Sequence, residues 1–168
     1  MKFFAIVALL LATVGITSGS EYELVQDVTD VKVKASAYDM SPRTEGGCYK
    51  KGCKPEFVVD GRIKDLSRWS CSEDIADGEQ CVLTLVFDER QEVVKVGIAF
   101  YKGKERMRTL KVVANGSKHL GEITSSGMSR DLEWFDIYAS KVRTLSFKSL
   151  NLDDDEWISI TEVGHSML

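Results

Sequence analysis

The chain has 168 residues, of which 43% are hydrophobic and 29% charged, and its formal net charge is −4. This length suits one domain with a short appendage, and the composition is that of a globular protein rather than a disordered tail. General nucleic-acid binding rests on a basic footprint that meets many phosphates, so this acidic chain is not expected to bind nucleic acid.

The N-terminus carries an apolar segment, residues 3–16, which follows a lysine and ends in small residues. A membrane-spanning helix needs roughly 20 apolar residues, and this segment is shorter and lies at the very start of the chain. We therefore predict a signal peptide over residues 1–20 and one secreted domain over residues 21–168. An uncleaved anchor is the alternative, and no membrane insertion of the mature chain is expected.

The rest of the chain alternates short runs of β-branched and aromatic residues with turn residues, and it has no long amphipathic helix pattern. Alternating apolar and polar residues over 31–37 predict a strand with one buried face. Further runs predict strands at residues 82–87, 93–101, 110–114, 134–138, 142–147 and 157–163. About seven strands at this spacing are typical of an all-β sandwich or jelly roll. One short helical turn is expected at residues 55–59.

Four cysteines follow the predicted signal peptide, and thiols in an oxidising compartment pair as disulfides. Of the three possible pairings we favour Cys48 with Cys53 and Cys71 with Cys81, since each pair closes a short loop bracketed by turn residues. A zinc site is the alternative. It is disfavoured because the spacing is not that of paired Cys-x-x-Cys motifs and both histidines lie far away.

Two further motifs give weaker signals. Asn115 begins an Asn-Gly-Ser glycosylation sequon, which is used only where the source cell glycosylates exported proteins. Residues 153–156 form an acidic run that is either a solvated loop or part of a calcium site, although it lacks the EF-hand pattern.

Residues 100–110 form the most informative stretch, because Lys102, Lys104, Arg106 and Arg108 recur at every second position. Wherever the backbone is extended these cations share one face, and a turn at Gly103 is expected to gather them further. Arginine can bind a carboxylate with two parallel hydrogen bonds, and lysine adds a mobile charge. The array therefore favours an extended acidic ligand. The alternative is the solvated face of an edge hairpin, where lysines also discourage aggregation.

Aromatic residues supply the other half of a sugar site, because the C–H face of a pyranose packs on an aromatic plane. Tyr101, Trp69 and Trp157 lie at the ends of predicted strands, although core packing is the default for any one tryptophan. Recognisable catalytic motifs are missing, including a Gly-x-Ser-x-Gly elbow, a His-Glu-x-x-His motif and a phosphate-binding glycine loop. We therefore expect no enzymatic activity.

Three segments occur in an informative order: Val59-Asp60-Gly61 with Ser67-Arg68-Trp69-Ser70, then residues 97–103 with Arg106, and finally residues 156–163. In this order they resemble discoidin-like (coagulation factor V/VIII type C) domains, and more narrowly the carbohydrate-binding modules attached to alginate lyases. The resemblance covers about residues 28–163. It implies an eight-stranded jelly-roll sandwich, with the ligand site in the loops at one end and no catalytic machinery.

The resemblance also implies site residues, since the Tyr-Lys-Gly segment of the family and its following arginine fall on residues 101–103 and Arg106. We expect the ligand site to comprise Arg68, Trp69, Tyr101, Lys102, Lys104, Arg106 and Trp157. The family often holds a structural calcium, whose ligands would fall on Asp60 or Asp65, Ser67 and Glu162. The interval from Asp60 to Trp69 is longer than is usual for the family.

Together these features predict a secreted, lectin-like, monomeric module that binds an acidic polysaccharide such as alginate or another polyuronate. An extracellular adhesion or matrix protein that binds another protein is one alternative, and a small polysaccharide lyase is another. An exposed apolar patch at the loop tips would favour adhesion, whereas a basic groove would favour the polysaccharide.

Overall fold

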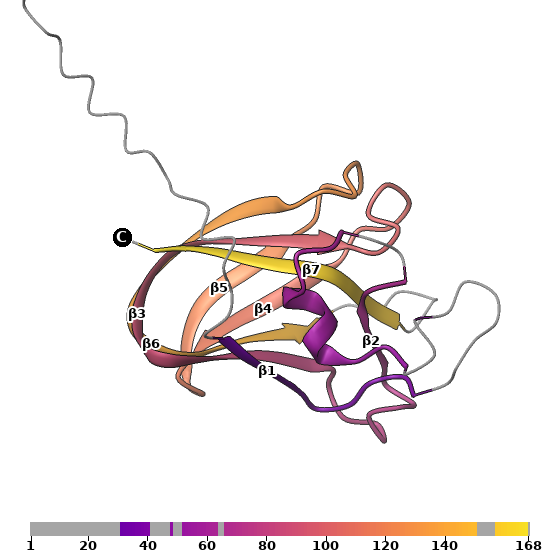
Figure 1. Ribbon diagram of the computed structural model, residues 1–168, viewed down its shortest axis with the longest axis horizontal. Helices are drawn as coiled ribbons and strands as arrows, with labels where there is room; N and C mark the ends of the chain where they lie inside the picture. The colour runs from indigo at the N-terminus through magenta and orange to yellow at the C-terminus, as the bar shows by residue number, and fades with distance from the viewer. Residues whose placement is uncertain (1–30, 41–47, 49–51, 64–65, 151–156, 168) are drawn as a thin grey trace, which may run out of the picture.

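Antiparallel strands make up nearly all the regular structure of the computed structural model, which describes residues 31–40, 48, 52–63, 66–150 and 157–167 (Figure 1). The elements in chain order are β1 (Val31–Ala35), the 3-10 helix η2 (Pro55–Val59), β2 (Trp69–Ser72), β3 (Val82–Phe100), β4 (Thr109–Ala114), β5 (Lys118–Thr124), β6 (Glu133–Ser149) and β7 (Trp157–Met167). The strand order is β2-β7-β3-β6-β4-β5, and β1 pairs with β3. The predicted signal peptide lies outside the described residues.

The two long strands β3 and β6 build the sandwich, because each contributes to both layers. The first half of β3 pairs with β1 and with the end of β6, whereas its second half pairs with the start of β6 and with β7. Register shifts between Val86 and Lys95 interrupt this pairing, and such irregularities bend a strand. Both strands curve strongly in Figure 1. The sequence predicted two separate strands in each of these regions, and the structure has one continuous strand in each.

The core lies between the two layers and takes side chains from strands of both. The largest fully buried residues include Trp69, Phe87, Phe147, Leu83, Leu85, Ile98, Leu110, Leu145, Ile158 and Ile160. Burying a side chain of this size contributes about 1.5–3 kcal/mol, so these positions define the fold. Along β1, Val31 and Val33 pack against the core while Lys32 and Lys34 are exposed, which confirms the predicted one-sided strand.

Strands β2 and β5 were not among the predicted elements. In β5 only Ile123 is buried, so this edge strand carries little of the apolar alternation that marks a strand. In β2 all four residues are buried, but two of them are serines, which hides the pattern. The helical turn predicted at residues 55–59 is confirmed as η2. Within the described ranges, no helix is long and apolar enough to cross a bilayer.

Both predicted disulfides are present. Cys48 pairs with Cys53 and Cys71 with Cys81, with Cα–Cα distances of 5.1 and 5.9 Å. The second bridge joins β2 to the start of β3 inside the core. The first lies beside β2, because Cys48 Sγ is 3.8 Å from the Arg68 carbonyl oxygen. The zinc alternative is thereby excluded, since all four thiols are consumed.

Candidate functional site

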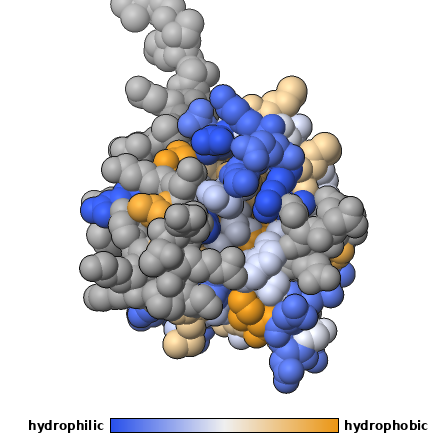
Figure 2. All heavy atoms as spheres, turned by 90° about the vertical axis from the view of Figure 1, so that its right-hand side faces the viewer, coloured by the Kyte–Doolittle hydropathy of each residue, from blue (hydrophilic) through white to orange (hydrophobic). Residues whose placement is uncertain are grey.

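A polar pocket of about 200 Å³ opens at the end of the sandwich where β2 and β7 begin. We call it the Tyr101 pocket, and its lining residues are Asp39, Arg68, Ser70, Tyr101, Lys102, Arg106, Trp157 and Ser159. Figure 2 faces this end of the molecule, where strongly hydrophilic side chains gather beside a strip of intermediate hydropathy. The pocket therefore presents polar and aromatic groups together.

The pairing of β2 with β7 forms one side of the pocket. Trp69 faces Ile160 in register and both point into the core, so the alternate pair, Ser70 and Ser159, points away from it. The two serine hydroxyls lie 2.7 Å apart and share a hydrogen bond. Strand alternation thus places two hydroxyl groups at the pocket.

The segment after β3 forms the opposite side as a tight turn. The Tyr101 N–H donates to the Ser159 carbonyl, and the Glu105 N–H donates to the Lys102 carbonyl at 2.8 Å. Lys102 adopts a left-handed backbone conformation with φ 55°. A side chain on Gly103 would place its Cβ 2.0 Å from the Ser129 carbonyl oxygen, so only glycine allows this approach of the two loops.

This turn changes the predicted basic array. The alternating cations were expected to share one face and to be gathered further by a turn at Gly103. Residues 101–105 do form a turn, but it does not bring the four cations together. Lys102 and Arg106 line the pocket, whereas Lys104 is exposed and does not line it. Arg108 is buried behind the site, where its Nε donates to the Trp157 carbonyl at 3.2 Å. The array is therefore divided among three environments.

Arg68 supports the aromatic part of the pocket. Its guanidinium carbon lies 4.1 Å from the centroid of the Tyr101 ring, and its Nε donates to the Ser70 hydroxyl at 3.2 Å. Lys102 Nζ lies 5.9 Å from the centroid of the same ring. A cation over an aromatic face is attracted by the ring quadrupole, so these contacts hold the tyrosine in place.

Trp69 is a correction to the predicted ligand site. Its side chain is 1% exposed, and its indole Nε1 donates to the Ala37 carbonyl at 2.9 Å. The residue is inward-facing on β2, so it packs in the core and its ring is closed to a ligand. Trp157, by contrast, is partly exposed and lines the pocket.

The described lining of the pocket is opposite in charge to the whole chain. Among the residues that the structure describes, three cationic side chains line the pocket, namely Arg68, Lys102 and Arg106, against one carboxylate, Asp39. The 168-residue sequence has a formal net charge of −4, so the described pocket lining is more positive than the chain as a whole. Clefts of one charge sign attract ligands of the other.

Solved structures resemble this one over most of its length. The CBM32 of AlyQ, solved in complex with 4,5-unsaturated mannuronic acid, is 26% identical, with a TM-score of 0.64 over 86% of this chain and 95% of that one. An F5/8 type C domain from Bacteroides fragilis is 14% identical, with a TM-score of 0.61 over 84% and 93%. The chain has the discoidin-like sandwich fold. A pectin-binding carbohydrate-binding module shares this fold at 21% identity, with a TM-score of 0.63 over 80% and 88%.

Two of these neighbours are carbohydrate-binding modules, the class of domain that the sequence resemblance indicated. No protein-family model and no curated protein sequence matches the chain. Sequence reasoning missed three pocket residues of the module, Asp39, Ser70 and Ser159. Single serines and one aspartate carry no motif, and they become neighbours only through the β2–β7 register and the backbone bond from Asp39 N to the Ser70 carbonyl.

The oxygen atoms expected to hold calcium meet at the turn after η2. The Arg62 N–H donates to Asp60 Oδ1 at 3.0 Å and to Glu162 Oε2 at 3.1 Å, and the Ser67 hydroxyl bonds Asp60 Oδ2. Burial, together with the charge of Asp60, raises the pKa of Glu162 to about 7. Asp65 lies outside the described residues, as does the acidic run at 153–156.

This donor set suits a hard cation. Calcium takes carboxylate, hydroxyl and carbonyl oxygens. A cation between Asp60 and Glu162 would favour the ionised glutamate, whose pKa is raised mainly by burial and to a lesser degree by the charge of Asp60. Among the described residues, no group of three or more His, Cys, Asp or Glu side chains forms a metal cluster. Any ion here would therefore need Ser67 and backbone carbonyls beside the two carboxylates.

Proposed function

We propose that the protein is a non-catalytic, secreted module that binds an acidic polysaccharide, with alginate or another polyuronate as the ligand class. The observation that carries this proposal is the cationic, aromatic Tyr101 pocket on an acidic protein. Neighbours solved with 4,5-unsaturated mannuronic acid or described as pectin-binding support it.

Each group in the pocket has a role in this proposal. Arg106 and Lys102 bind the uronate carboxylate, because charge-assisted hydrogen bonds are the strongest available to this anion. Tyr101 and Trp157 offer aromatic surface to the apolar face of the sugar ring. Asp39 and the serine pair take the ring hydroxyls as hydrogen-bond partners. Lys104 contributes at most a solvated charge at the rim.

Export is part of the proposal. The two disulfides suit an oxidising compartment, and the N-terminal apolar segment supplies the route to it. A secreted module would meet polysaccharide outside the cell, where such polymers are found in matrices and walls. N-terminal sequencing of the secreted protein tests this step, and a first residue other than Glu21 would move the proposed cleavage site.

Affinity electrophoresis tests the ligand class. The protein is run in native gels that contain alginate, a neutral glucan or no polymer, and we expect retardation in alginate alone. Retention should fall with added salt, because exposed ion pairs are screened within about 10 Å at 0.1 M ionic strength. Equal mobility in the three gels would reject an acidic polysaccharide ligand.

The two alternatives, an adhesion module and a lyase, predict different properties of the protein. An adhesion module that docks on protein would be expected to present a contiguous apolar patch, and the lining of the Tyr101 pocket is cationic and polar instead. A lyase would release unsaturated uronate. Incubation with alginate, followed by ultraviolet absorbance of that product, separates a lyase from a binding module.

A further inference from the structure

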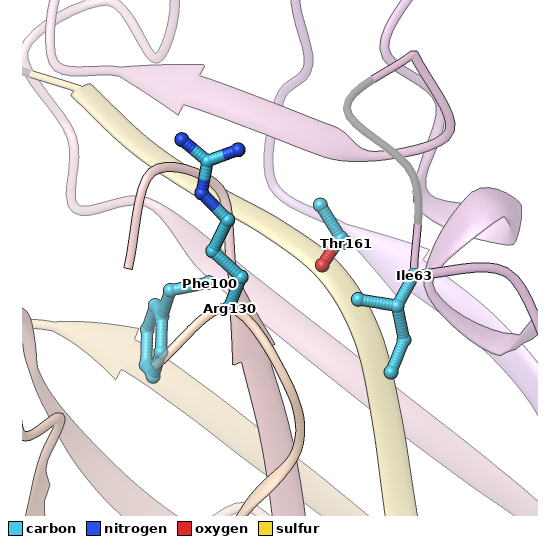
Figure 3. Close-up of a pocket in the computed structure, with 4 residues that line it drawn as sticks. All are labelled: Ile63, Phe100, Arg130 and Thr161. Carbon is cyan, nitrogen blue, oxygen red and sulfur yellow. The ribbon is translucent and has the colours of Figure 1, made fainter. Parts of the chain in front are cut away.

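A second pocket, of about 260 Å³, lies beside β7 (Figure 3). We call it the Arg130 pocket, and its lining residues are Ile63, Phe100, Arg130 and Thr161. In Figure 3, Thr161 projects from β7 between Arg130 on one side and Ile63 on the other, and the Phe100 ring points away from the guanidinium. The volume is slightly below the range of about 300–1,000 Å³ for drug-sized ligands, so the pocket suits one small group such as a sugar ring.

An irregularity in the pairing of β3 with β7 creates this pocket. Ala99 pairs with Glu162 and Phe100 with Ile160, so Thr161 is an extra residue on β7. The Thr161 hydroxyl donates to the Ala99 carbonyl at 3.0 Å, which fixes the bulge. Bulges redirect side chains and occur often beside functional sites.

One carboxylate links the two pockets. Glu105 Oε1 lies 3.4 Å from an Arg130 guanidinium nitrogen, and Glu105 Oε2 lies 3.6 Å from Lys102 Nζ. Lys102 lines the Tyr101 pocket and Arg130 lines the other. Glu105 therefore bridges one cationic side chain of each pocket, and the close approach of Gly103 to Ser129 holds their loops together.

The Glu105 carboxylate is weakly held by both cations. Its side chain and that of Arg130 are about half exposed, 52% and 50%, and both contacts exceed the 2.7–2.9 Å that is typical of a strong charge-assisted hydrogen bond. Exposed ion pairs of this kind add little to stability. An incoming carboxylate on a ligand can therefore replace Glu105 on Arg130 with little loss of protein stability.

We propose that the Arg130 pocket is a second subsite for the same polymer, which binds the uronate next to the one in the Tyr101 pocket, with Glu105 displaced from Arg130 in the complex. This inference rests on the proposed function. Two linked subsites make the second contact intramolecular, so affinity should rise with ligand length. A polymer is thus bound along its chain rather than by a single sugar.

Calorimetric titration of the complete secreted protein with mannuronic acid and with its linear tetramer tests the proposal. We expect the wild type to bind the tetramer at least about tenfold tighter than the monomer, which exceeds the statistical factor of about four for equivalent residues. Arg130→Gln should lose this gain and keep the monomer affinity. Glu105→Gln, which removes the competing charge, should bind the tetramer more tightly than the wild type does.

Arg90→Gln is the matched control, since Arg90 is an exposed arginine at the bend of β3, about 30 Å along the strand from Phe100. It should leave both affinities unchanged. Monomer binding without a length gain in the wild type, or a gain retained in Arg130→Gln, would overturn the second subsite alone. If the wild type bound neither probe, the proposed function itself would fail and the second subsite with it.

Discussion

The guanidinium carbon of Arg68 lies 4.1 Å from the centroid of the Tyr101 ring, so a buried cation stacks on one face of an aromatic ring that lines the pocket. Arg68 comes from the segment before β2, and Tyr101 follows β3. Their contact joins two loops that are separated in sequence. Arg68 is only 6% exposed. Its burial is tolerated because the guanidinium has two partners, the Tyr101 ring and the Ser70 hydroxyl, to which its Nε donates.

Replacing Tyr101 tests this stack. Tyr101→Leu keeps an apolar group but removes the π face, and we expect it to lower stability by about 0.5–2 kcal/mol, the range for cation–π contacts. It should also weaken alginate binding. Tyr101→Phe keeps the ring and should retain most of the stability. Urea unfolding and gel retardation measure the two effects, and equal losses in both variants would show that the hydroxyl matters rather than the stack.

Arg106 is the residue whose removal should most weaken polyuronate binding. Arg106→Ala should cost about 1.5–3 kcal/mol of binding free energy, as expected for a hydrogen bond to a charged group. Folding should be nearly unchanged. Lys104→Ala removes the same charge from outside the pocket and should cost under about 1 kcal/mol. Ligand titration and thermal melting of both variants provide the measurement.

A folded Arg106→Ala protein with unchanged binding would place the ligand elsewhere. Lost thermal stability with unchanged binding per folded molecule would instead show that the arginine packs the loop. The Lys104 variant separates a local contact from a general loss of positive charge, because both changes alter the net charge equally.

The sequence predicted the sandwich and several of the pocket residues. The sandwich was predicted from the alternation of residues, and the pocket residues from the order of the motifs. β-Branched alternation marks strands wherever one face is buried, which is why β1 and β4 were placed within a residue or two. The order of the three motif segments along the chain, which resembles that of discoidin-like domains, identified Arg68, Tyr101, Arg106 and Trp157. All four line the pocket.

The remainder depended on tertiary structure. The glycine at position 103 predicts the turn, but the alternation of charges does not predict that Lys102 and Arg106 line the pocket while Arg108 is buried. Trp69 could be assigned to the core only once its register with Ile160 was known. Strand β5 is too polar to be recognised alone, since β4 provides the pairing that makes it a strand.

The pH dependence of stability should reveal Glu162. Its pKa in the folded protein is about 7, against an ordinary value of 4.5, mainly because burial disfavours the charged form. The folded state therefore binds this proton more tightly than the unfolded state does. The contribution of Glu162 to the free energy of unfolding is fully present below pH 4.5, and it is lost as the pH rises through about 7.

Glu162→Gln isolates this effect. In calcium-free buffer the variant should melt above the wild type at pH 8, and the difference should shrink as the pH falls to 4.5. Differential scanning calorimetry at several pH values measures it. A difference that is constant with pH would show that Glu162 does not titrate in this range.

Calcium binding should restore the stability that the folded protein loses when Glu162 ionises. At pH 8, millimolar calcium chloride should raise the melting temperature of the wild type, because an ion that binds only the folded state stabilises by about 2.7 kcal/mol at one hundred times its dissociation constant. The effect should be smaller at pH 5, where the ion competes with the proton on Glu162. Asp60→Asn and Glu162→Gln should respond little, and an unchanged wild type would reject the calcium site.

Asn115 acts as a clamp between the β4–β5 turn and β6, so its role in folding can be tested apart from its sequon. Its side-chain amide donates to the Lys141 carbonyl at 3.0 Å, and its Oδ1 accepts from the N–H groups of Arg143 and Thr144 at 2.8 and 3.3 Å. The residue has φ 51°, a conformation that glycine adopts without strain. Asn115→Gly therefore removes the three hydrogen bonds with little backbone cost.

We expect Asn115→Gly to lower the free energy of unfolding by about 1–3 kcal/mol, since each hydrogen bond contributes roughly 0.5–1.5 kcal/mol and these are exposed. Ser117→Ala is the matched control, because it destroys the same sequon while leaving the Asn115 amide in place. Urea titrations of both variants, produced in a host that does not glycosylate, give the comparison. A Ser117→Ala protein as unstable as Asn115→Gly would assign the loss to the turn itself and refute the clamp.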